Sequence, residues 1–300
     1  MTDAHMGEIV ALITVFCWTA TALAFEAAGR RVGSLAVNVI RIGMALVFIT
    51  AFCAIWRGPA LWLPFDASPH ALLWLSLSGF VGFALGDLFY FRALVTLGSR
   101  MATLIMLTLA PPLAALFGML WLDEHLTLLQ WGGMAATIVG VAFVVSERRN
   151  GENGVSISGV GIIFGVLGAL GQAGGAVLGK LARADIDAVG ATQIRVIAGV
   201  AGLFLVATVI GWWPKVIAAF RDRIAVAQMT GGALFGPFLG VLLFQVAIWM
   251  TDVGVVQTIA ALVPIVIIPI AVYAKKEKVT LRAVLGSVIA VGGVALLFTS

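Results

Sequence analysis

Long apolar stretches separated by short polar segments run through the whole chain. Ten of them are each close to the roughly 20 residues that a bilayer-spanning helix needs. They cover residues 7–29, 34–56, 70–91, 100–121, 127–146, 157–180, 189–211, 224–249, 253–273 and 279–298. A backbone in lipid must satisfy its own hydrogen bonds, and the alternating segments of about 10 residues that typify a membrane barrel do not occur. The pattern therefore predicts an all-α integral membrane protein with ten transmembrane helices.

The composition agrees with a chain whose solvent is membrane lipid. Hydrophobic residues make up 62% of the chain and charged residues 11%, whereas about a quarter of a soluble domain is charged. The net charge of +4 is spread over short loops and is not gathered in one patch. This distribution argues against a nucleic-acid partner.

The sequence offers no set of residues for catalysis, metal binding or a cofactor. Cys17 and Cys53 both lie inside apolar stretches, and His5, His70 and His125 are isolated from one another, so neither a disulfide nor a metal site is predicted. No metalloprotease, serine hydrolase or nucleotide-binding motif occurs, which argues against an enzyme. A channel would more often show a ring of charges or a filter loop.

Basic residues are distributed unequally between the two sides that successive loops would occupy. Three lie on the side that holds both termini and thirteen on the other, and Arg41 and Arg195 lie within spans, which accounts for all 18. Because short basic loops stay in the cytoplasm, both termini are expected to face outward.

The second half of the chain repeats the first. A shift of 154 residues, which becomes 153 after one loop, superposes polar as well as apolar positions. The matches least easily produced by chance are Arg41 with Arg195, Pro111 with Pro264, Glu124 with Glu277 and Thr127 with Thr280. Five spans per copy is an odd number, so the second copy would enter the membrane inverted, as in secondary transporters. We expect one membrane domain built from a first five-helix repeat over residues 1–150 and an inverted second repeat over residues 151–300.

An ordered set of motifs resembles the EamA-type branch of the drug/metabolite transporter superfamily. The set consists of Tyr90-Phe91-Arg92-Ala93-Leu94, Pro111, Asp123-Glu124, Gly133 and Gly140-Val141, then Val263-Pro264, Lys276-Glu277 and Gly286 to Gly293, with Arg41 and Arg195 in the second helix of each copy. The resemblance spans nearly the whole chain and is nearest to the YddG-type aromatic amino-acid exporters of bacterial inner membranes. It implies an amino-acid exporter of a bacterial inner membrane, with periplasmic termini. The copies differ at one notable position, where Val241 stands opposite Asp87.

Residues near the middle of the spans are candidates for lining a central cavity. They are Trp18, Gly82, Thr103, Gln172, Gln257 and Thr258. Gln172 places an amide near the bilayer centre, where an unpaired polar group is costly, so it binds either a substrate or a neighbouring helix. Trp18 occupies the corresponding place in the first copy, where it either stacks on a substrate or fills space.

Prolines are expected to break three of the spans. Pro111 and Pro112, Pro237, and Pro264 with Pro269 each remove a helical hydrogen bond and kink the rod. The kinks are either hinges for moving half-helices or static bends that fit the bundle.

Few charges lie inside the spans. Three of them are placed by their distance from the expected cytoplasmic edge of the span, which is the side with thirteen basic residues. Arg41 lies about two turns from that edge, Asp87 about one turn, and Glu26 near the edge itself. An ion pair between Arg41 and a carboxylate is expected, either as a gate at the cytoplasmic mouth or as a structural tie. No acidic residue within a span is available to Arg195.

These features favour a small-molecule exporter that works by alternating access, with aromatic or apolar amino acids as cargo. No acid lies at mid-depth, which favours a facilitative carrier over a proton-coupled one. Sugars, nucleotide sugars and drug-like metabolites are the alternative cargoes, and phosphate-bearing cargo would require cations on the cavity wall. Because one chain contains both halves, a monomer in membrane lipid is the expected functional unit.

Overall fold

The computed structural model describes residues 5–64, 66–97, 99–145, 158–183, 186–266, 269 and 281–298, and these form helices and short connections without strands. The first half contains α1 (Met6–Val32), α2 (Ser34–Trp56), η1 (Pro59–Leu61), α3 (Pro69–Gly79), η2 (Phe80–Gly86), α4 (Asp87–Leu97), α5 (Ser99–Trp121) and α6 (Leu128–Val145). The second half contains α7 (Gly159–Leu181), α8 (Ala188–Val209), α9 (Trp213–Ala219), α10 (Arg223–Ala233), η3 (Leu234–Gly240), α11 (Val241–Met250), α12 (Val253–Ala260) and α14 (Leu281–Leu297). The motif Lys276-Glu277 and the repeat partner Thr280 lie outside the described residues.

Seven of the predicted spans are helices long and apolar enough to cross a membrane. They are Met6–Val32, Ser34–Trp56, Pro69–Ala93, Ala102–Trp121, Gly159–Leu181, Ala188–Val209 and Arg223–Met250. Three further apolar helices, Leu128–Val144, Val253–Val266 and Val284–Leu297, are shorter. The all-helical membrane fold is therefore confirmed, and the count of ten crossings stays a prediction.

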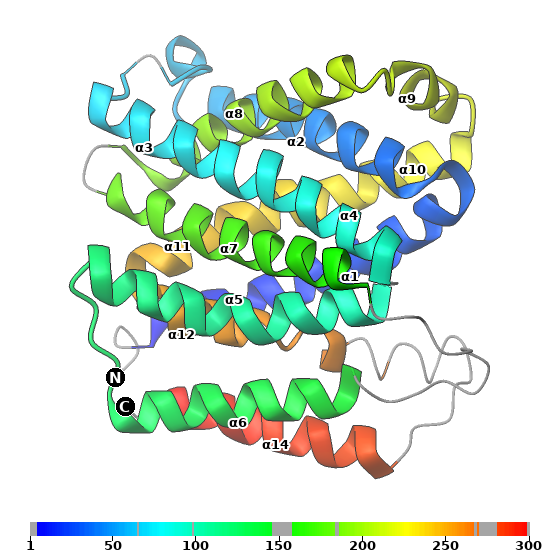
Figure 1. Ribbon diagram of the computed structural model, residues 1–300. Coiled ribbons are helices and arrows are strands. Elements are labelled where there is room, and N and C mark those ends of the chain that lie inside the picture. The colour runs from blue at the N-terminus through cyan, green and yellow to red at the C-terminus, as the bar shows by residue number, and fades with distance from the viewer. Residues whose placement is uncertain are drawn as a thin grey trace.

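Helices of the two halves pack against each other throughout the bundle (Figure 1). α2 packs on α8, and α6 packs on α14. α1 lies against α10, η3 and α11, just as α7 lies against α3, η2 and α4. The rings of His5 and Phe298 are 5.9 Å apart, so the two described ends of the chain meet at one end of the bundle. Each of three clusters of buried apolar residues contains residues from both halves, so the halves do not form separate bundles.

Two seven-residue π-helical segments, η2 and η3, occupy equivalent places in the two halves. Phe80–Gly86 and Leu234–Gly240 are separated by the 154-residue shift of the sequence repeat. A π-helix is wider than an α-helix because its hydrogen bonds span five residues, and such segments often occur at functional sites. Pro237 lies inside η3, so one of the predicted proline irregularities coincides with a real one.

The prolines of α5 do not break their helix. α5 continues from Ser99 to Trp121 through Pro111 and Pro112, contrary to the expected interruption. Neighbouring helices can hold a proline turn of a membrane helix in place, and buried Ala110, Ala114 and Ala115 let them pack closely around this one. In the second half, by contrast, the helix is interrupted at residues 261–262, just before Pro264.

The backbones of η2 and α7 approach each other closely, and their contact consists of glycine on glycine. A Cβ atom added to Gly171 would lie 2.5 Å from the Cα of Gly86, and one added to Gly175 would lie 2.8 Å from the Cα of Gly82. Small residues allow such approaches between membrane helices. The equivalent contact of α1 with η3 uses larger side chains, among them Thr21, whose hydroxyl donates to the carbonyl of Gly232 at 2.9 Å.

We expect Gly171→Ala to destabilise the bundle by about 1–3 kcal/mol, because the added methyl group meets backbone that cannot move aside. Gly174→Ala is the matched control on the same helix, since its Cβ would meet only Val81 Cγ1 at an ordinary 3.6 Å. Alanine favours helix by up to about 1 kcal/mol, so the control should be neutral or stabilising. Thermal unfolding in detergent, followed by circular dichroism, measures the melting temperatures of both variants. Equal changes in melting temperature for Gly171→Ala and Gly174→Ala would contradict the interpretation.

Candidate functional site

A cavity of about 550 Å³ lies in the middle of the bundle and is walled by both halves. Its lining comprises Trp18, Thr21, Ala22, Phe25, Arg41, Phe83, Asp87, Tyr90, Thr103, Met106, Leu107, Ala110 and Pro111 from the first half, and Gln172, Gly236, Pro237, Val241, Gln257, Ala260, Ala261, Val263 and Pro264 from the second. The wall is mostly apolar and aromatic, and its polar groups are few. A volume of several hundred cubic ångströms is typical of small-molecule sites.

Positions related by the sequence repeat face this cavity from opposite halves. The related pairs on its wall include Trp18 with Gln172, Phe83 with Pro237, Asp87 with Val241, Leu107 with Ala260, and Pro111 with Pro264. The cavity therefore lies where equivalent surfaces of the two copies meet, which is where an internally duplicated transporter places its ligand.

An ion pair between Arg41 and Asp87 forms part of the cavity wall. The Asp87 and Arg41 side chains are 16% and 15% exposed, respectively. Arg41 Nε also donates to Asn38 Oδ1 at 2.8 Å, and the guanidinium carbon lies 5.8 Å and 6.0 Å from the ring centres of Phe25 and Phe91. The guanidinium is thus fixed by several contacts, whereas Asp87 makes its one hydrogen bond within the described residues to Arg41.

Of the two carboxylates expected to be available to Arg41, Asp87 is the partner. Glu26 instead pairs with Arg30, one turn along α1, at 2.5 Å on the surface. The helix that carries Asp87 does not end near residue 91 but continues to Leu97. Ten residues separate Asp87 from that end, or about 15 Å of helix. The depth of Asp87 in the membrane stays a prediction.

The remaining polar groups of the wall are two amides and a hydroxyl pair. Tyr90 Oη and Thr103 Oγ1 are hydrogen-bonded at 2.9 Å. Gln172 makes no hydrogen bond with the described part of the chain, and the Nε2 of Gln257, a residue only 4% exposed, also lacks a partner there. Both amides therefore have donors or acceptors left for a ligand.

Two predicted lining residues lie elsewhere. Gly82 packs against Gly175 at the glycine contact, and Thr258 is fully buried with its hydroxyl bonded to the Gly254 carbonyl at 2.7 Å. Trp18, Thr103, Gln172 and Gln257 lie on the wall, whereas Pro112, predicted as a hinge, and Glu26, predicted as part of the gate, do not.

Sequence reasoning missed an aromatic and polar stripe on α1 and one residue of η2. Thr21, Ala22 and Phe25 face the cavity beside Trp18, and Phe83 faces it from η2. Positions 18, 21, 22 and 25 follow the three-and-four spacing of one helical face, so extending the stripe from Trp18 would have found them.

The opposite end of the bundle, near the described chain ends, is closed by a buried polar network. Lys180 Nζ bonds to Glu124 Oε1 at 2.5 Å and to the carbonyl of Thr251 at 2.6 Å, while the Val253 amide donates to Glu124 Oε2 at 3.0 Å. Burial raises the pKa of Glu124, and the nearby Lys180 ammonium opposes that rise. This network joins the α5–α6 connection to α7 and to the start of α12.

Arg195, the repeat partner of Arg41, is buried away from the cavity. It is 3% exposed, donates to Gln245 Oε1, and lies 5.2 Å from the ring centre of Phe83. Gln245 Nε2 in turn donates to the Gly179 carbonyl at 2.8 Å. The expectation that no acid in a span pairs with Arg195 holds for the described residues, where an amide and a ring take that place.

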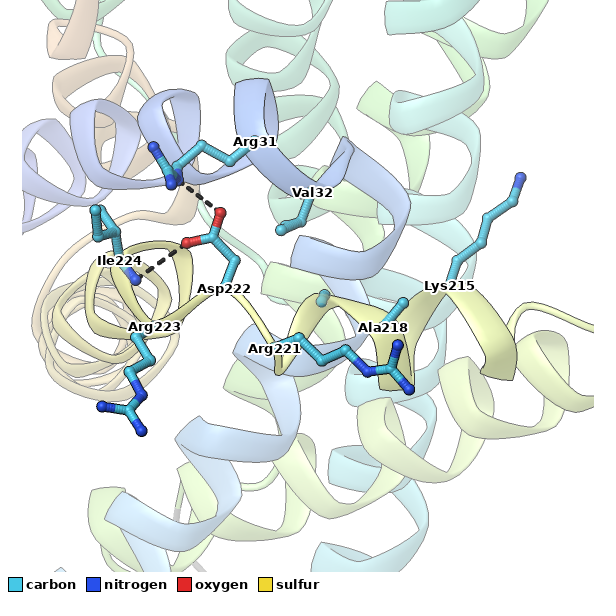
Figure 2. A pocket seen from close by; sticks show the side chains of 9 residues that line it. Arg31, Val32, Lys215, Ala218, Arg221, Asp222, Arg223 and Ile224 are labelled. Atoms are coloured by element: carbon cyan, nitrogen blue, oxygen red, sulfur yellow. Dashed lines mark hydrogen bonds and ion pairs between the residues drawn. The ribbon is translucent and has the colours of Figure 1, made fainter.

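A second hollow, of about 740 Å³, is lined by Arg31, Lys215, Arg221, Arg223 and Asp222 among others. We call the end of the bundle that carries these residues the arginine-rich end. Arg31 Nε bonds to Asp222 Oδ2 at 2.8 Å, and Asp222 Oδ1 accepts the amides of residues 224 and 225 at the start of α10. Figure 2 shows Lys215, Arg221 and Arg223 pointing in different directions. The cations do not converge on one point, so the Arg31–Asp222 contact is a tie between α1 and α10.

Apolar helices of membrane-crossing length around a cavity shared by two related halves define a multi-pass membrane transporter of small molecules. The chain belongs to the EamA-like transporter family, whose model matches residues 5–146 and again residues 159–299. The resemblance to the EamA-type branch of the drug/metabolite transporter superfamily is thus confirmed, and so is its occurrence twice in the chain, whereas the nearer resemblance to YddG-type exporters stays a prediction.

A solved structure described only as "Crystal structure of protein" has the same fold. It is 16% identical to this chain, with a TM-score of 0.73 over 98% of this chain and 96% of that one. A comparison with curated proteins gave no match.

The Arg31–Asp222 tie should make stability depend on acid pH. Backbone hydrogen bonding at the start of α10, chiefly from Ala225, and the Arg31 contact lower the pKa of Asp222. A lowered pKa adds stability above the ordinary aspartate value of about 3.9, and that stability is lost as the pH falls through the folded-state value. Asp222→Asn keeps a capping side chain but removes the charge. The melting temperature of the wild type should therefore exceed that of the variant at pH 6, and the difference between the two melting temperatures should shrink toward pH 3. A gap that widens in acid would contradict this.

Proposed function

We propose that this protein exports amino acids with aromatic or apolar side chains across a bacterial inner membrane. The observation that supports this most is the chemistry of the cavity wall. Among the described residues, Arg41 is the one cation and Asp87 the one carboxylate on a surface that is otherwise uncharged and mostly apolar and aromatic. Such a wall suits a ligand with no net charge and an apolar body.

The same wall does not favour the alternative cargoes. A nucleotide sugar carries phosphates, which are bound by several cations or by cations free to accept them. Arg41 is already paired with Asp87. A free sugar needs many hydrogen-bonding partners, and the wall offers mainly Gln172, Gln257, Thr21 and the Tyr90–Thr103 pair.

Alternating access by two inverted halves is the mechanism that we propose. In the conformation described here, the buried Lys180–Glu124 network occupies the end of the bundle near the described chain ends. The Arg41–Asp87 pair and the α1 stripe of Trp18, Thr21, Ala22 and Phe25 extend the cavity toward the arginine-rich end. The excess of basic residues assigns the arginine-rich end to the cytoplasm and both termini to the periplasm. One chain supplies both walls, so the proposed unit is a monomer.

We propose facilitative transport, because the one carboxylate of the described cavity wall is neutralised by an arginine. Asp87 is the residue through which proton coupling would act if it occurred. A proton-coupled carrier would show uptake that changes when the pH gradient is collapsed.

Proteoliposomes containing the purified protein test the proposal. We expect uptake of tryptophan and phenylalanine well above protein-free vesicles, weaker uptake of threonine, and none of a nucleotide sugar or a cationic dye. Imposing a pH gradient should leave the initial rates within about twofold. Movement of the nucleotide sugar alone would refute the amino-acid assignment, and a rate that follows the pH gradient would refute facilitative transport.

A further inference from the structure

We infer that the Arg41–Asp87 ion pair is the recognition site for the α-amino and α-carboxylate groups of a zwitterion. In this inference, which rests on the proposed function, the substrate carboxylate takes the place of Asp87 on Arg41. The substrate ammonium group then binds the released Asp87 carboxylate. Asp87 thus holds the place on Arg41 that the substrate carboxylate takes, and Arg41 holds the place on Asp87 that the substrate ammonium group takes.

The geometry leaves both partners with unused bonding capacity at the cavity wall. A guanidinium group has five N–H donors, and a carboxylate can accept about four hydrogen bonds. Arg41 uses Nε for Asn38 and one terminal nitrogen for Asp87, and Asp87 bonds through Oδ2. No further hydrogen bond to Asp87 is found in the described part of the chain. A bidentate carboxylate can therefore be added to Arg41 with little rearrangement of Arg41 itself.

Charge balance explains why a zwitterion is the class of ligand selected. A buried charge left without its partner is strongly unfavourable, while exchanging one opposite-charge pair for two keeps every charge paired. An amine without a carboxylate would compete with Arg41 for Asp87 and leave the guanidinium unpaired. An acid without an ammonium group would leave Asp87 unpaired. Both should bind at least tenfold more weakly than the amino acid.

The rest of the cavity accounts for the side chain of the ligand. Beyond the ion pair the wall is formed by Trp18, Phe83, Pro111 and Pro237, which present apolar and aromatic surface. One face of Trp18 is covered by Phe244, whose ring centre lies 5.3 Å away. The unpartnered Nε2 of Gln257 can donate to a polar side-chain atom.

The described residues of the second copy offer no competing Arg–carboxylate pair on the cavity wall. Val241 stands where a second carboxylate would be, and Arg195 is turned away from the cavity toward Gln245. One zwitterion site per cavity fixes the orientation of the ligand, with its charged end at α2 and α4.

Three ligands with the same indole test the inference: tryptophan, tryptamine, which lacks the carboxylate, and indole-3-propionate, which lacks the ammonium group. Competition with labelled tryptophan in proteoliposomes, and ligand-induced thermal stabilisation in detergent, give two readouts. In the wild type, tryptophan should compete at least tenfold better than either analogue. Arg41→Gln should lower the preference for tryptophan over tryptamine, because the carboxylate is no longer recognised. Asp87→Asn should lower the preference for tryptophan over indole-3-propionate, because the ammonium group is no longer recognised. The reciprocal pattern cannot arise from loss of folding alone.

Arg31→Gln and Asp222→Asn are matched controls, because they break an Arg–Asp pair of the same chain outside the cavity. Neither should change the ratios. If the wild type recognises tryptophan but accepts both analogues equally well, or if the cavity variants keep the wild-type ratios, the inference is refuted while amino-acid export stands. If the wild type, correctly folded by circular dichroism, neither transports nor binds tryptophan, the proposed function fails first.

Discussion

The glycine-on-glycine contact between η2 and α7 is the constraint on which the other features depend. Two backbones meet where Gly82 and Gly86 face Gly171 and Gly175, and a methyl group has no room at Gly171 or Gly175. Lipid gives apolar helices little reason to associate, so close backbone packing supplies much of the cohesion. By fixing η2 against the second half, this contact fixes the start of α4, and with it Asp87. The equivalent contact of α1 uses Thr21 and Trp18, and there the cavity opens between the helices.

Hydrophobic pattern alone was enough to predict the bundle. Long apolar runs can only be helices in lipid, so α1, α2, α7 and α8 begin and end within a few residues of their predicted bounds. Helix ends were less predictable. The apolar span was expected to end near residue 91, but the polar segment that includes Arg92 continues as helix for six more residues, to Leu97. Pro111 and Pro112 show a second limit, since whether a proline bends a membrane helix depends on neighbours that a sequence does not name.

The cavity was predictable in part, for a related reason. Residues with an unusual chemistry inside a span, such as Gln172 near the middle and Arg41 about two turns from the edge, were identified because polar groups in lipid are costly and often functional. Residues of ordinary chemistry, such as Phe25 and Phe83, were missed because only their orientation distinguishes them from packing residues. The choice between Glu26 and Asp87 as the partner of Arg41 likewise required the helix rotation set by the π-helical segment η2.

The difference between the copies at Asp87 and Val241 has an energetic consequence. A carrier made of two identical inverted halves would have two conformations related by a two-fold rotation, which would have equal free energies and equal populations. This chain places its intramembrane ion pair in one half, and gives the other half an arginine bound to an amide. The two orientations are then no longer degenerate. On the alternating-access mechanism that we propose, this difference at Asp87 and Val241 would give one of the two conformations the lower free energy before substrate binds.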